Sequence, residues 1–158
     1  MIALTPIGTV HSGRTDIDDD FAWDTVPTRI ELNAGFAPEA LAGLEDFSHA
    51  EVLYHLDRIP ESAIERAGRH PRGNPRWPKV GIFAQRGAAR PNRIAATIVR
   101  VVRVEGRVLH VVGLDALDGS PVLDIKPVMR EFLPRGEVAQ PKWATELMAG
   151  YWKREPSA

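Results

Sequence analysis

Cysteine is absent from the 158 residues of this chain. Disulfide bonds, thiolate metal sites and a nucleophilic cysteine are therefore excluded, and a reducing cytoplasm is the compartment that the composition predicts. The first residues, MIALTPIGTVHSG, lack the basic start and long apolar run of a signal peptide, and no stretch approaches the roughly 20 apolar residues that a membrane span needs. We expect a cytoplasmic protein with no membrane partner.

Motifs of common catalytic folds are absent as well. The sequence contains no GxGxxG, no GxxxxGKS or GxxxxGKT, and no GxSxG, which excludes the usual nucleotide-fold and hydrolase signatures. The acidic run at residues 16–20 resembles the start of a calcium loop but lacks its glycine and late glutamate, so an exposed acidic loop is the better interpretation. The histidines show no HExxH spacing, and a zinc site at His49 and His55 is a weak alternative. We predict no bound metal.

Charge is distributed unevenly along the chain. Residues 1–57 carry eleven acids and two arginines, residues 58–107 carry twelve basic residues and three glutamates, and residues 108–158 carry seven acids and six bases. A basic segment of this density can neutralise phosphates and attract an anionic partner, of which nucleic acid is the commonest. The alternative is that the acidic first third folds back onto the basic middle and cancels its field.

The overall pattern predicts a mainly β fold. Apolar residues make up 44% of the chain, enough for a single domain with a genuine core across residues 1–158. Short β-branched runs separated by Gly, Pro and Asp indicate strands, without regular alternation with helices. A small, closed or partly closed antiparallel β-barrel with two or three short helices is therefore the predicted class. Strands are expected at residues 7–11, 29–32, 50–56, 80–85, 94–104, 108–114 and 122–125.

Two features of these elements are specific. Gly106 lies between two valine-rich runs and predicts a hairpin turn, while Arg100 and Arg103 interrupt the first run and predict a β-bulge. Helices are expected at residues 38–44 and 142–152. The C-terminal helix is amphipathic, and its aromatic face is expected to pack on the core or, as the alternative, on a second copy of the chain.

The segment VGIFAQRGAARPNRI, residues 80–94, runs from an apolar strand into a tight loop with three arginines. Arg86, Arg90 and Arg93 offer planar, permanently charged donors that suit the carboxylate or phosphate of an anionic ligand. The alternative is an arginine-rich loop that only faces water.

A second basic segment, RHPRGNPRWPK, spans residues 69–79 and is expected to form a loop. Proline stiffens the chain, so this loop can lie against a phosphate backbone while Trp77 stacks on a base. The alternative is a surface loop held in place by a buried Trp77.

The segment GLDALDGSPVLDIKP, residues 113–127, carries aspartates with different expected roles. Asp115 can accept a hydrogen bond from a ligand amine or ribose hydroxyl, whereas Asp118 precedes a glycine and is expected to hold the turn. Asp124 and Lys126 are alternate residues of a strand and are expected to form an ion pair on one face.

Three segments, GLEDFSHAEVLY, VGIFAQRGAARPNRI and GLDALDGSPVLDIKP, resemble in order the conserved blocks of the TsaA-like family, also called YaeB or TrmO. The resemblance covers about residues 4–127 and leaves residues 128–158 as a C-terminal extension of a single TsaA-like domain. It implies a small β-barrel methyltransferase that uses S-adenosylmethionine, works as a homodimer and modifies tRNA. In the characterised branch the product is N6-methyl-N6-threonylcarbamoyladenosine beside the anticodon.

The resemblance also assigns residues. The family's cofactor contacts fall in the region after Ser12 and on Asp57, Arg58, Arg86, Ala88, Leu114, Asp115, Ala116 and Leu117. We assign catalytic roles, in shaping the loop or contacting the acceptor, to Arg90 and Asn92. The tRNA-facing surface is assigned to Arg69, Arg72, Arg76, Trp77, Lys79 and Arg93.

The chain departs from the family pattern at three places. Leu56-Asp57 stands where a Phe-His pair is common, Arg93-Ile94-Ala95 follows the RPN tripeptide in place of Pro-Ile-Gly, and Gln85 replaces a threonine before Arg86. These changes bear on the acceptor pocket. Two alternatives stay open, namely a nucleic-acid-binding barrel without catalysis and a methyltransferase of small molecules.

Overall fold

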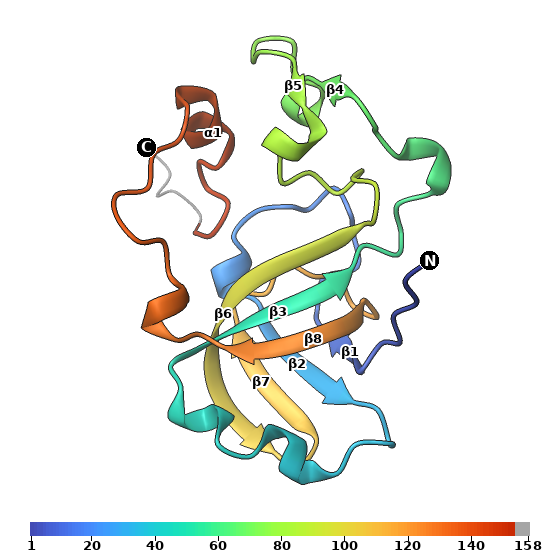
Figure 1. The fold of residues 1–158 in the computed structure, drawn as a ribbon, viewed down its shortest axis with the longest axis vertical. Coiled ribbons are helices and arrows are strands. Elements are labelled where there is room, and N and C mark those ends of the chain that lie inside the picture. The colour runs from blue at the N-terminus through green and yellow to red at the C-terminus, as the bar shows by residue number, and fades with distance from the viewer. Residues whose placement is uncertain (154–158) are drawn as a thin grey trace.

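The structure, a computed structural model, describes residues 1–153. Six antiparallel strands close into a barrel in the order β1-β2-β7-β6-β3-β8, with β8 pairing back onto β1, and this closure leaves the barrel no free edge (Figure 1). The predicted fold class is confirmed. The strands are β1 Gly8–His11, β2 Pro27–Leu32, β3 His49–His55, β6 Ile94–Glu105, β7 Val108–Val112 and β8 Pro121–Pro127.

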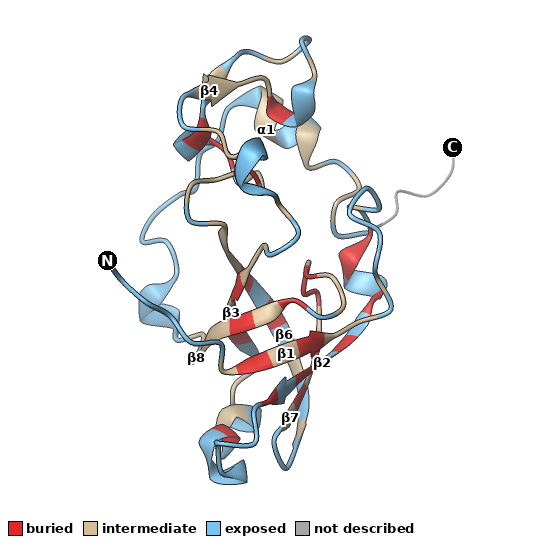
Figure 2. Cartoon of the chain, turned by 90° about the vertical axis from the view of Figure 1, so that its right-hand side faces the viewer, coloured by how far each residue is buried: buried red, intermediate tan, exposed pale blue. Residues whose placement is uncertain are grey.

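The barrel core follows from the period of two in the strands. In β2 the burial alternates strictly between exposed and buried residues, and in β7 it alternates between half-buried and buried ones, so one face of each strand points inward. Val10, Ile30, Val52 and Leu109 are fully buried at the centre of this core. Figure 2 shows the buried residues concentrated in the barrel, with exposed residues in the segments above and below it.

The predicted hairpin and bulge are both confirmed. Gly106 has a φ of 58°, which favours glycine, and it connects β6 to β7. The register of the two strands shifts between Val101 and Arg103, so Val102 is an extra residue in β6. A bulge of this kind changes which way the following side chains point.

The prediction of a strand at residues 80–85 is correct for the first two residues and wrong for the remaining four. β5 is Val80–Gly81, which pairs with β4 Gly68–Arg69, and the chain then turns through the 3-10 helix η6 Ile82–Ala84. The turn buries Ile82 almost completely and brings in the side chain of Gln85, whose amide donates to the carbonyls of Arg69 and Val80, each at 3.0 Å. These non-local bonds override the apolar pattern that suggested a strand.

Both predicted helices are shorter than expected. Residues 38–44 form two 3-10 helices, η2 Pro38–Leu41 and η3 Leu44–Asp46, because Gly43 between them has a φ of 84°. The C-terminal helix α1 spans Lys142–Leu147 only, and Gly150 with a φ of 72° turns the chain back toward the barrel. Four more 3-10 helices complete the described chain: η1 Trp23–Thr25, η4 Glu61–Ala63, η5 Pro71–Gly73 and η7 Arg130–Phe132.

The loops divide between the two ends of the barrel. The segments that join β1 to β2, β3 to β6 and β7 to β8 meet at one end, together with α1 and the small β4-β5 sheet (Figure 1). The β2-β3 segment and the β6-β7 hairpin lie at the other. We call the first of these the loop end, because it gathers the residues that the sequence analysis assigned to the cofactor, to catalysis and to tRNA. Across residues 1–153, no helix is both long and apolar enough to span a bilayer.

Candidate functional site

Asp115 lies at the centre of the loop end. Its neighbours Leu114 and Ala116 are buried, and its own carboxylate accepts hydrogen bonds from three hydroxyls. Tyr54 of β3 donates to Oδ1 at 3.0 Å, Thr97 of β6 donates to the same oxygen, and the C-terminal Tyr151 donates to Oδ2. Residues from three distant parts of the chain thus fix the orientation of one carboxylate.

The two tyrosines of this network are held in their protonated form. Burial raises the pKa of Tyr54 far above its ordinary value, and the negative charge of Asp115 adds to the shift. The same two causes raise the pKa of Tyr151. Tyr54 Oη also donates to the backbone carbonyl of Asp115 at 2.7 Å. Both phenols therefore act as hydrogen-bond donors, and neither can serve as a general base near neutral pH.

A second carboxylate, Asp20, lies close enough to influence this network. It accepts hydrogen bonds from Trp23 Nε1 at 2.9 Å and from Arg72 Nη2 at 3.1 Å. Burial raises the pKa of Asp20 despite these two donors, and the charge of Asp115 contributes to the rise. Two carboxylates that repel each other in this way favour a cationic ligand group between or beside them.

The backbone around Asp115 offers donors without partners. None of the N–H groups of residues 114–117 donates a hydrogen bond to another residue in the described part of the chain, although Leu114 and Ala116 are buried. Pairing resumes at the turn, where Asp118 N donates to Arg14 O at 2.7 Å and Gly119 N to Val10 O at 2.8 Å. Because buried backbone donors are almost always paired in folded proteins, this segment is suited to receive a ligand.

The other aspartates of this segment follow the structural roles predicted for them. Asp118 Oδ1 accepts from Ser12 N at 3.0 Å, and Gly119 adopts a φ of 82°, so Asp118 holds the turn. Lys126 Nζ lies 2.6 Å from Asp124 Oδ2 on β8. Neither the turn aspartate nor the ion pair calls for a catalytic explanation.

The arginines of residues 86–93 are largely used by the fold itself. Arg90 Nη1 donates to Gln85 O at 2.9 Å, Arg93 Nη1 donates to Ile59 O at 2.7 Å, and Arg86 Nη2 donates to Ala96 O. The guanidinium groups therefore hold the β3-β6 segment in place. Asn92 is exposed, and Ala88 is half-buried.

The other residues predicted for the cofactor lie beside the Asp118 turn. Arg58 is exposed, and its Nη2 donates to the carbonyl of Asp118, so it joins the end of β3 to the segment after β7. Asp57 is exposed next to it. The structure thus brings Arg58 close to the aspartate segment, as the predicted site requires.

The basic segment 69–79 is fixed at both sides. Trp77 is half-buried, and its Nε1 donates to Glu146 Oε2 of α1 at 3.0 Å, so α1 pins the loop. Arg72 pairs with Asp20 and lies 4.8 Å over the ring of Phe21, so at this point the acidic first third does contact the basic middle. Arg76 and Lys79 are exposed.

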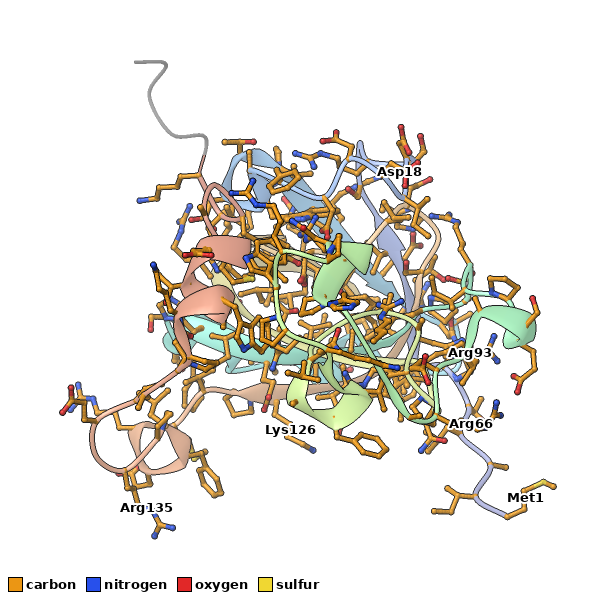
Figure 3. The ribbon with its side chains drawn as sticks, turned by 90° about the horizontal axis from the view of Figure 1, so that it is seen from above. Met1, Asp18, Arg66, Arg93, Lys126 and Arg135 are labelled. Carbon is orange, nitrogen blue, oxygen red and sulfur yellow. The ribbon has the colours of Figure 1, made fainter. Side chains whose placement is uncertain are left out.

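Arg69 is placed differently from the other cations of this segment. It is half-buried in β4, and its Nε has no hydrogen-bond partner among the described residues. Its Nη2 lies 2.8 Å from the position that a Cβ on residue 87 would occupy, so a side chain at Gly87 would displace the end of this guanidinium group. Figure 3 looks onto the loop end and shows the labelled Arg93, Arg66 and Asp18 toward its rim.

Sequence reasoning assigned no part in the site to four residues that complete it: Tyr54, Thr97, Asp20 and Tyr151. Asp20 was expected in an exposed acidic loop but is half-buried. Tyr151 was expected on the apolar face of a helix, but the helix ends before it. The chain pairs instead with the segment after β1, through Ala22 N to Gly150 O and Trp23 N to Tyr151 O, both at 3.1 Å. The aromatic residues near the C-terminus were the available signal, but only the fold shows that one of them reaches Asp115.

Sequence comparisons with known proteins give one consistent family. The sequence profile described as tRNA-methyltransferase O N-terminal domain matches residues 18–132. A probable S-adenosyl-L-methionine-binding protein of Pyrococcus abyssi is 36% identical over 142 residues, which cover 87% of this chain and 74% of the relative. The human tRNA (adenine(37)-N6)-methyltransferase is 35% identical over 65% of this chain and 23% of its own length.

Solved structures show the same fold. The crystal structure of TrmO from Pseudomonas aeruginosa superimposes with a TM-score of 0.71 at 29% identity, over 90% of this chain and 62% of that one. The chain therefore spans less than two thirds of the solved chain and about a quarter of the human relative.

Proposed function

Because this chain belongs to the tRNA-methyltransferase O family, we propose that it is a methyltransferase that uses S-adenosylmethionine and acts on tRNA. The observation that carries the proposal is the segment 114–117, whose free backbone donors flank the carboxylate of Asp115. Relatives named as S-adenosyl-L-methionine-binding proteins and as a tRNA methyltransferase support it.

The residues at the loop end fit this cofactor. Its sulfonium and ammonium groups are cationic, and Asp115 and Asp20 supply two carboxylates. Burial raises the pKa of Asp20, and the charge of Asp115 adds to the rise. The unpaired N–H groups of residues 114–117 suit a planar base or ribose, which need hydrogen bonds of fixed direction. Arg58 and Arg86 are exposed cations that suit the carboxylate of the methionine part.

When bound, the cofactor supplies an electrophilic methyl group on a positively charged sulfur. The residues of the chain contribute position and charge. Tyr54 and Thr97 hold the Asp115 carboxylate in one orientation before any ligand arrives, so little reorganisation is needed when a cation binds. Arg90 and Arg93 fix the loop that faces the acceptor through their bonds to backbone carbonyls. The protonated tyrosines do not take the acceptor's proton. We assign no side-chain base, and an acceptor that ionises readily or loses its proton to water suits the site.

We further propose that the acceptor is the N6 position of threonylcarbamoyladenosine beside the anticodon. The name of the human relative, which specifies adenine 37 and N6, supports this choice. The compartment that follows from a tRNA substrate is the cytoplasm.

The same proposal includes a homodimer. Phe132 is 86% exposed and Val138 68% exposed in the extension after β8, and a second copy of the chain would cover apolar side chains of this kind. Light scattering at micromolar protein concentration gives the oligomeric state directly.

Calorimetric titration with S-adenosylmethionine tests the proposal. The variant Asp115→Asn keeps an acceptor but loses the charge, and we expect its affinity to fall about tenfold to a hundredfold, the usual effect of losing a hydrogen bond to a charged group. Asp124→Asn is the matched control, since Asp124 pairs with Lys126 away from this segment. If the unaltered chain shows no heat of binding with S-adenosylmethionine, the remaining hypothesis is a nucleic-acid-binding barrel without catalysis. If the chain binds S-adenosylmethionine but does not methylate tRNA, the remaining hypothesis is a methyltransferase of small molecules.

A further inference from the structure

A hollow of about 690 Å³ lies on the outer wall of the barrel, away from the Asp115 network. Outward-facing residues of β1, β2, β7 and β6 line it, and we call it the wall groove. Its upper rim is formed by Ser12, Gly13 and Asp118 at the loop end. Among the residues that the resemblance assigns to the cofactor, only the region after Ser12 reaches this groove, through Gly13.

A row of cationic and titratable side chains crosses the wall groove. Arg29 of β2 pairs in register with His11 of β1 and with His110 of β7, and His110 pairs in turn with Arg103 of β6. His11, Arg29 and His110 each follow a buried core residue along their strands, and Arg103 is exposed. All four side chains therefore lie on the outer face of the barrel. At the usual strand spacing of about 4.8 Å, the row is about 14 Å long.

The bulge in β6 makes this row denser. In an unbroken strand, Arg100 and Arg103 would point to opposite faces, because they are three residues apart. The extra residue Val102 shifts the register, and both arginines are exposed on the groove side. The bulge that the sequence pattern predicted thus places a second arginine beside the row.

The arginines of the wall groove are only partly paired with acidic residues, and Asp118 adds one carboxylate at the rim. Glu31 lies 3.1 Å from His11, and Glu105 lies 2.7 Å from His110 and 3.2 Å from Arg103. Arg29 and Arg100 form no ion pair or side-chain hydrogen bond with any residue of the described chain. An anionic ligand in the groove would give the guanidinium groups of Arg29 and Arg100 the charged partners that they lack.

We propose that the wall groove binds the phosphate backbone of the RNA substrate beyond the nucleotide that enters the site. This inference rests on the proposed function, because it takes the occupant to be the same tRNA. Asp118 directly follows the segment 114–117, so the groove begins where the candidate site ends. Unpartnered guanidinium groups on a concave wall are the donors that phosphate contacts use.

The test compares two double variants with the same loss of charge. The double variant Arg29→Ala with Arg100→Ala removes the two unpartnered arginines. Neither side chain donates a hydrogen bond within the described chain, so the variant leaves no acceptor of the fold without its donor. Arg130→Ala with Arg135→Ala removes two exposed cations outside the groove. Fluorescence anisotropy with tRNA over a range of salt concentrations gives the affinity and its salt dependence, and circular dichroism checks the fold.

We expect the groove variant to bind tRNA about tenfold more weakly at low salt and to show a salt slope shallower by about 1 to 2, at roughly 0.7 to 0.9 per lost phosphate contact. Equal behaviour of the two double variants would overturn the inference. So would a crystal structure in which a second copy of the chain covers the groove, or an unaltered chain without affinity for tRNA. The affinity for S-adenosylmethionine is measured on the same preparations and tests the proposed function independently of the groove. The groove variant should bind this cofactor as the unaltered chain does, because it keeps Asp115 and the segment 114–117.

Discussion

Asp115 shows how much of the candidate site depends on single residues. Its carboxylate and its carbonyl together accept from Tyr54, Thr97 and Tyr151, which lie 61, 18 and 36 positions away in the sequence. Asp115 itself was assigned to the cofactor from the resemblance. Its three donors were not, because no local pattern links a strand tyrosine or a C-terminal tyrosine to a loop 18 or more residues away.

Removing the hydroxyl of Tyr54 tests the stability of this network. Tyr54→Phe leaves the Asp115 carbonyl without its side-chain donor and removes one of the two donors to Oδ1, so the free energy of unfolding should fall by about 1–3 kcal/mol. Urea denaturation measures the change. Tyr151→Phe is the matched control, because it removes a single hydrogen bond from a less buried residue and should cost less. A larger loss for Tyr151→Phe would contradict this account.

The raised pKa of Asp20 predicts a pH dependence of stability. Because the folded-state pKa lies above the ordinary value of 3.8, the folded protein binds this proton more tightly than the unfolded chain does. The contribution of Asp20 to stability is therefore greatest below pH 3.8 and declines as the pH rises through the interval up to the raised pKa. Asp20→Asn lacks this titration, so its stability relative to the unaltered protein should improve as the pH rises through that interval. Urea denaturation at several values between about pH 4 and about pH 7 measures the difference, and a difference independent of pH would refute the assignment.

At the scale of elements, the strands were the most predictable part. The hairpin between β6 and β7 and its bulge follow from Gly106 and from the arginines that break the alternation, and both are local signals. The run at residues 80–85 carried the same apolar signal but turns after Gly81, because the Gln85 amide bonds carbonyls up to 16 residues away. The sequence pattern cannot distinguish the two cases, since the deciding contacts are not local.

The pairing of β1 with β2 predicts a strong effect at Gly8. A Cβ on this residue would stand 2.5 Å from the carbonyl oxygen of Glu31, which is backbone and cannot move without separating the strands. We expect Gly8→Ala to lower the free energy of unfolding by about 1–3 kcal/mol or more. Gly35→Ala is the control, because nothing lies within 4 Å of its added carbon. Equal urea midpoints for the two variants would show that β1 is not held this closely.

At the scale of the whole molecule, the two charged thirds of the chain meet only in part. Arg72 pairs with Asp20, and Arg14 pairs with Asp19 within the first third itself. Arg76 and Lys79 stay exposed on the segment that α1 holds through Trp77. The basic field predicted from the charge distribution therefore persists on this side of the loop end, although the sequence alone left open whether the acidic segment would cancel it.

This exposed charge predicts a salt-dependent affinity for tRNA. Replacing Arg76 and Lys79 by alanine should weaken tRNA binding at low salt and reduce the salt slope by about 1 to 2, because each cation releases counterions when it contacts a phosphate. Filter binding at several salt concentrations measures both quantities. Replacing Arg107 and Arg135, two exposed cations outside this segment, gives the charge-matched control. If replacing Arg76 and Lys79 leaves the salt slope unchanged, the RNA does not contact this segment.

A crystal structure of this chain grown with S-adenosylmethionine tests the central claim most directly. We predict that the ligand contacts the free N–H groups of residues 114–117 and places a cationic group near the carboxylate of Asp115. A ligand bound in the wall groove, or crystals that take up none at saturating concentration, would contradict the assignment of this end of the barrel as the cofactor site.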